Sequence, residues 1–162
     1  MFGRIDPKEL NQNVFSMIGE QWMLVTAGTA ERCNTMTASW GGLGVLWGKP
    51  VATVYIRPQR YTLEFVERED CFTLSFFGEE YRKALALCGS KSGRDVDKVK
   101  ECGFTVAGAA CPTLRRPGWC WCVKRRTGRT WTRPTSWTES WTGSGTPSGT
   151  ITASLLGRLW KY

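Results

Sequence analysis

The alternation of apolar and polar positions over residues 1–107 predicts short strands interspersed with helices. Alternating segments bounded by turn residues predict strands at 22–26, 34–40, 51–57 and 71–77, and a further strand beginning at 104–106. Helical spacing and capping residues predict helices at 7–17, 62–68, 79–88 and 95–102. This mixture predicts a mainly β chain, which is either an α+β fold or a β-barrel with short flanking helices.

The pattern is lost near residue 108, which divides the chain into a domain at 1–107 and a tail at 108–162. The pair Trp-Thr recurs in the tail without a helical or strand period, and residues 143–150 read as a loop. We therefore expect the C-terminal part to be irregular, with little regular structure beyond 119–123.

The net charge changes at the same point. Residues 1–107 hold 13 basic and 13 acidic residues, whereas 108–162 hold nine basic residues and one acid, Glu139, so the tail carries the whole formal charge of +8. Six of the nine tryptophans also lie there. A basic, tryptophan-rich segment is able to stack on single-stranded nucleic acid. Because the tail lacks an ordered pattern, we expect no specific nucleic-acid partner.

The composition excludes several kinds of site. Histidine is absent, which excludes a Ser-His triad and a histidine zinc site. The seven cysteines form no C-x-x-C pair, so we expect reduced thiols in a cytoplasm. A thiolate site from Cys111, Cys120 and Cys122 lacks the usual ligand spacing, and we expect no metal. The sequence shows no signal peptide and no apolar run of roughly 18 residues, so we expect no membrane partner.

A candidate anion site lies at 57–62, where a strand is expected to end and a helix to begin. Pro58 ends the strand ladder, and Thr62 is a candidate N-cap. Arg57 and Arg60 add positive charge to the N–H groups of the first helical turn, which suits a phosphate monoester. The alternative is a pair of surface arginines at a turn.

A second candidate segment is 34–39, which combines an amide with three hydroxyl groups. Alternation places Thr35, Thr37 and Ser39 on one face and Met36 and Ala38 on the other. Small polar side chains suit the edge of a heterocycle or a ribityl chain. The alternative is an edge strand with a solvated face.

These segments, followed by the flexible basic loop at 89–95, resemble the flavin reductase-like family with the FMN-binding split barrel, which includes flavoredoxin-type proteins. The resemblance rests on "TMTASWGGLGVLW", "KPVATVYIRPQRYT", "CFTLSFF" and "EEYRKALALCGSKSGRDVDK". It implies a homodimer with FMN near the subunit interface, and electron transfer between a nicotinamide nucleotide and flavin or a flavin-linked acceptor. The alternative is a non-catalytic flavin or small-ligand binding protein on the same barrel.

The resemblance also implies roles for individual residues. The flavin would be lined by Asn34, Thr35, Met36, Thr37, Ala38 and Ser39, and its phosphate held by Arg57, Arg60, Tyr61 and Thr62. The loop of Lys91, Ser92, Gly93 and Arg94 would close over the cofactor. A flavin carries the electrons itself, so no catalytic histidine is required.

The resemblance ends near residue 107, and a change of reading frame accounts for this. If the reading frame is shifted by one base, the bases that encode Thr113 to Lys124 can instead encode the sequence "YFEEARLVLVCK". That sequence has the pattern of an acidic turn followed by an alternating strand. We therefore interpret 108–162 as the family's C-terminus out of frame, with the shift between Thr105 and Pro112. An incomplete barrel, weak FMN binding and an inactive gene product would follow.

Overall fold

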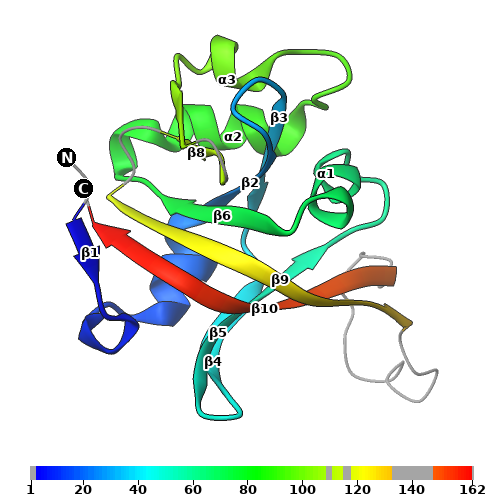
Figure 1. Cartoon of the computed structure of the whole chain (residues 1–162). Helices are drawn as coiled ribbons and strands as arrows, with labels where there is room; N and C mark the ends of the chain where they lie inside the picture. The colour runs from blue at the N-terminus through cyan, green and yellow to red at the C-terminus, as the bar shows by residue number, and fades with distance from the viewer. Residues whose placement is uncertain (1–2, 109–110, 115–117, 133–147, 162) are drawn as a thin grey trace, which may run out of the picture.

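The computed structural model describes residues 3–108, 111–114, 118–132 and 148–161. One antiparallel sheet dominates it, with the strand order β3-β2-β6-β9-β10-β5-β4 and β1 paired to β10 (Figure 1). Its strands are β1 (Gly3–Ile5), β2 (Met23–Gly28), β3 (Cys33–Ala38), β4 (Gly41–Leu46), β5 (Lys49–Ile56), β6 (Cys71–Phe76), β9 (Trp119–Thr132) and β10 (Ser148–Lys161). A second small sheet pairs β7 (Val106–Ala107) with β8 (Thr113–Leu114). The expected mainly β, α+β architecture is confirmed.

Short helices flank this sheet. They are α1 (Thr62–Arg68), α2 (Arg82–Ser90), α3 (Lys98–Glu101), two 3-10 turns, η1 (Pro7–Glu9) and η3 (Glu79–Tyr81), and the π-helix η2 (Ser16–Gln21). The three α-helices all contact β3, and Figure 1 shows α2 and α3 together at the end of the molecule that holds β3 and β8. Within the described part of the chain, no helix is both long and apolar enough to cross a membrane.

The prediction of one helix over residues 7–17 is wrong. Asp6 caps a 3-10 turn as expected, with its Oδ1 accepting from the Lys8 N–H at 2.9 Å, but the turn ends at Glu9. The Asn13 side chain then accepts hydrogen bonds from the N–H groups of Phe15 and Ser16. This is the arrangement of a helix N-cap, so a separate helical segment begins at residue 14 and the first turn is not extended.

A strand at Gly41–Leu46 was not expected, because its glycines hide the alternation. It forms a hairpin with β5 through the two residues Trp47 and Gly48, whose φ angles are 50° and 70°. Positive φ at both positions is typical of a tight type I′ turn. Gly41 lies so close to β5 that a Cβ there would stand 2.4 Å from the Thr53 carbonyl oxygen.

The expectation that the tail has little regular structure beyond 119–123 is wrong. β9 and β10 are 14-residue strands that pair with each other, β9 also pairs with β6, and β10 also pairs with β5. They therefore join the β3-β2-β6 half of the sheet to the β5-β4 half, and the closing strands are present. The expectation failed because backbone pairing needs an open neighbouring edge more than a regular side-chain pattern. Residues 133–147, which include most of the expected loop, lie outside the described part of the chain.

The first residues of β9 also contribute to the core. Cys120, Trp121 and Val123 are buried, and Trp121 and Val123 join the main apolar cluster beside residues such as Phe72 and Ile56. Trp121 is 1% exposed, and its indole Nε1 is buried with no hydrogen-bond partner among the described residues. A large side chain therefore fills the core at the expense of one unpaired N–H group.

We predict that Trp121→Ala and Trp121→Phe differ strongly in stability. Removing the side chain leaves a cavity and should lower the free energy of unfolding by about 3–5 kcal/mol. Phenylalanine keeps most of the volume and removes an unpaired donor whose burial costs about 1–3 kcal/mol, so its net effect should stay within about 1 kcal/mol. Urea unfolding measures both. No loss in either variant would show that Trp121 does not pack in the core, and equal losses would show that phenylalanine does not fill the space.

Candidate functional site

Three segments that are distant in sequence meet around two adjoining cavities. The basic cavity, of about 180 Å³, is lined by Met36, Arg57, Gln59, Arg60, Tyr61, Thr62, Ser90, Lys91, Ser92, Gly93 and Lys98. The aromatic cavity, of about 120 Å³, is lined by Met36, Thr37, Ala38, Ser39, Trp40, Tyr55, Arg57 and Arg60. The two share Met36, Arg57 and Arg60, so they form one continuous site between β3, the start of α1 and the loop after α2.

The basic cavity concentrates positive charge. Arg57, Arg60, Lys91 and Lys98 line it, and no carboxylate is among its described lining residues. The Arg60 guanidinium is fixed by a 2.6 Å hydrogen bond from Nη1 to the Gly89 carbonyl oxygen. Burial, and secondly the charge of Arg57, lower the pKa of Arg60. Like charges held together without an acid favour the binding of an anion.

The start of α1 differs from the expected N-cap. The hydroxyl oxygen of Thr62 does not cap the helix but accepts a 2.8 Å hydrogen bond from Nδ2 of Asn34, and both side chains are buried. The N–H groups of Leu63 and Glu64 donate to the carbonyl oxygens of Arg60 and Tyr61. The anion site therefore relies on charged side chains more than on open N–H groups of the first turn.

The two faces of β3 are only partly those expected. Thr37 and Ser39 line the aromatic cavity, and Met36 and Ala38, although buried in the core, line it too. Thr35 is fully buried and lines neither cavity; its hydroxyl accepts a 3.0 Å hydrogen bond from Thr26. The expectation that Thr35 faces a ligand is therefore not met, because β2 takes up its side chain.

The loop expected to close the site is divided between neighbouring cavities. Lys91 and Ser92 line only the basic cavity, whereas Arg94 lines an adjacent cavity of about 490 Å³ together with Asn34. The Arg94 guanidinium is paired with Glu64 and lies 4.4 Å from the centre of the Tyr61 ring. Arg94 therefore fastens the loop to α1 and adds no charge to the basic cavity.

Gly93 allows this loop to approach β3. A Cβ at position 93 would stand 1.9 Å from Oδ1 of Asn34, far inside the contact distance. A side chain here would push the loop away or break the bond between Asn34 and Thr62. The close approach therefore requires glycine at this position.

Lys98 is a site residue that the sequence pattern did not reveal, as are Trp40 and Tyr55. It is 5% exposed, lines the basic cavity, and donates 2.9 Å hydrogen bonds from Nζ to the carbonyl oxygens of Thr35 and Cys88. Burial lowers the pKa of Lys98. Lysine is rarely buried unless its charge is paired or bonded, so this ammonium fixes β3 against α2. As one more charged residue in a short polar segment, it carried no distinguishing signal.

The aromatic cavity adds a flat, partly apolar wall. The Arg57 guanidinium lies 5.6 Å from the centre of the Trp40 ring, and Trp40 and Tyr55 remain partly exposed beside it. The site thus combines strong positive charge with aromatic and small polar surface. Neither cavity has a carboxylate among its described lining residues.

Several solved structures share the fold of this chain, although their sequence identity to it is low. Flavoredoxin from Methanosarcina acetivorans matches with a TM-score of 0.71 and 18% identity, over 98% of this chain and 76% of that one. The FMN-binding protein from Thermus thermophilus with bound 1-cyclohex-2-enone matches with a TM-score of 0.69 and 17% identity, over 97% and 80%. An FMN-binding domain of a flavin reductases-like enzyme from Shewanella baltica OS155 matches with a TM-score of 0.71 and 17% identity, over 99% and 77%.

A comparison with curated proteins found no match. The family model of the flavin reductase like domain, however, matches residues 15–132, which is most of the chain and includes β2 to β9. The strand order, the site between β3 and α1, and this match lead to one conclusion. The chain belongs to the flavin reductase-like family and has its split-barrel fold.

Proposed function

We propose that this protein binds FMN across the two adjoining cavities and acts as an FMN-dependent oxidoreductase. The observation that carries the proposal is the basic cavity, in which four cationic side chains meet without a described carboxylate. A phosphate monoester is the part of FMN that such a cavity suits. The aromatic cavity next to it offers Trp40 and Tyr55 to the ring system.

The residues that line the two cavities have distinct roles in this proposal. Arg57, Arg60 and Lys91 contact the phosphate, while Lys98 holds the backbone of β3 at Thr35. Thr37 and Ser39 present small polar groups to the ribityl chain or ring edge. The bound flavin supplies the redox chemistry, and the protein orients it and limits water access.

A homodimer is part of the same proposal, and the β4–β5 hairpin is the surface that supports it. Its large apolar side chains are unusually exposed, with Val45 at 75% and Trp47 at 90%, and Trp40 beside the site at 52%. Exposed apolar patches of this kind mark association surfaces. A second copy on the hairpin would cover them next to the aromatic cavity.

We predict that Arg60→Ala weakens FMN binding at least about tenfold and leaves riboflavin binding little changed. A charge-assisted hydrogen bond contributes about 1.5–3 kcal/mol, and only FMN carries the phosphate. Flavin fluorescence quenching measures both ligands. Arg68→Ala is the matched control, because Arg68 is exposed at the end of the same helix and lies outside both cavities. Equal losses for FMN and riboflavin would remove Arg60 from the phosphate site.

The choice between an oxidoreductase and a non-catalytic flavin-binding protein requires a turnover measurement. We expect the protein with added FMN to oxidise NADH or NADPH steadily, faster than FMN alone at the same concentration. Arg60→Ala should raise the FMN concentration needed for half-maximal rate. Tight FMN binding without any nicotinamide oxidation would favour the non-catalytic alternative.

We also propose that residues 108–162 are the family's C-terminus read out of frame. The unpaired indole N–H of Trp121 and the +8 charge confined to this part support the idea. The family-model match runs past the proposed junction to residue 132 and weighs against it. Sequencing the locus on both strands should find one added or lost base between the codons for Thr105 and Pro112. An intact frame there would refute the proposal.

A further inference from the structure

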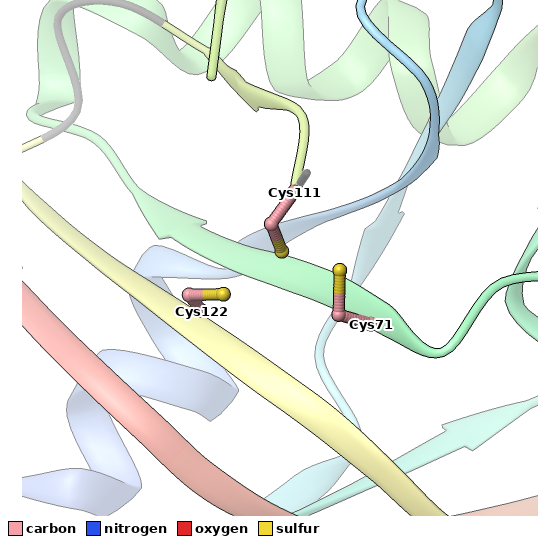
Figure 2. Close-up of side chains that lie close together, drawn as sticks. All are labelled: Cys71, Cys111 and Cys122. Atoms are coloured by element: carbon pink, nitrogen blue, oxygen red, sulfur yellow. The ribbon is translucent and has the colours of Figure 1, made fainter. Parts of the chain in front are cut away.

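Three cysteines that are far apart in sequence meet on one face of the sheet. Cys71 begins β6, Cys122 lies on β9, and Cys111 lies just before β8. Their Sγ atoms all lie within 4.8 Å of one another, and Figure 2 shows the three side chains pointing toward a common centre. We call Cys71, Cys111 and Cys122 the thiol cluster.

Strand register explains how two of the thiols meet. Cys71 pairs with Lys124 and Thr73 pairs with Cys122, so Cys71 and Cys122 occupy neighbouring diagonal positions of one antiparallel ladder. Diagonal neighbours project from the same face of a sheet and lie within side-chain reach. The core residue Trp121 projects from the other face.

A buried hydrogen bond brings in the third thiol. The Thr73 hydroxyl donates to the Pro112 carbonyl oxygen at 2.7 Å, which holds the segment of Cys111 over the ladder. Cys120, which the sequence grouped with Cys111 and Cys122, belongs elsewhere, because its Sγ lies 3.4 Å from the Ser75 hydroxyl. The cluster therefore contains Cys71 in place of the Cys120 that the sequence analysis considered.

The cluster combines proximity with limited access to solvent. All three side chains are partly buried. The Cys111 thiol donates hydrogen bonds to Cys122 and Cys71, and these bonds, followed by burial, raise the pKa of Cys111. Three thiolates at these distances repel one another, and a soft divalent cation is the partner that removes this repulsion.

We propose that Cys71, Cys111 and Cys122 bind a zinc-type divalent metal ion through three thiolates, with the fourth position open to water. Zinc–sulfur bonds of about 2.3 Å in a tetrahedral site hold the sulfurs about 3.8 Å apart, so only a small contraction of the cluster is needed. Each thiol releases its proton to solvent as the sulfur–metal bond forms, and no atom changes oxidation state. The ion would link β6, β9 and the segment before β8.

The test uses the full chain, reduced with a phosphine and freed of metal with a chelator. Titration with Co²⁺ should reach one ion per chain, with thiolate-to-cobalt charge-transfer absorption and the visible bands of a tetrahedral site. Addition of Zn²⁺ should remove both signals. Bound metal should also raise the melting temperature, because it binds only the assembled cluster.

Cys71→Ser, Cys111→Ser and Cys122→Ser should each weaken Co²⁺ binding roughly tenfold or more. Cys33→Ser is the matched control, since Cys33 is a partly buried cysteine outside the cluster and should bind as the parent does. If a serine variant fails to fold, the charge-transfer intensity of the parent still reports how many thiolates bind. No cobalt spectrum in the parent, or equal binding by all four variants, would overturn the proposal.

Discussion

The pairing of β9 and β10 between β6 and β5 is the constraint on which the rest of the structure depends. The strand order places β3 at one end of the sheet and β4 and β5 at the other. Nevertheless, Thr37 and Ala38 of β3 line the same cavity as Tyr55 of β5, so the two ends of the sheet meet. A sheet whose ends meet is a barrel, and the candidate site lies at the seam. Without β9 and β10, the two walls of the site would belong to separate pieces.

The charge at that seam works against folding and in favour of binding. Burial, and secondly the charge of Arg57, lower the pKa of Arg60, and Lys98 is held in a buried position by two carbonyl oxygens. An anion that binds the folded state relieves this repulsion, and its binding free energy adds to stability. In the proposed function, the phosphate of FMN therefore contributes both to affinity for the cofactor and to closure of the barrel.

The parts of the site that local sequence determines were predictable. The helix Thr62–Arg68 has the expected bounds, and Arg57 and Arg60 lie at its start because Pro58 ends the strand before it. Lys98 and the Asn34–Thr62 bond were not predictable, since each depends on segments about 28 or more residues apart that only the tertiary fold brings together. Thr35 was misplaced because alternation assigns a face without saying which neighbour covers that face.

Residues 108–162 show that backbone pairing and side-chain packing place different requirements on a sequence. Its composition argued for irregular structure, yet 14-residue strands form there, because the N–H and C=O groups of β5 and β6 offer pairing partners to any chain without proline at the paired positions. Side chains are less tolerant. The same strand that places Val123 well in the core leaves the Trp121 N–H unpaired and brings Cys122 beside Cys71. The unpaired indole and the thiol cluster are therefore consequences of one register, in which residue 121 faces the core and residue 122 faces the opposite side.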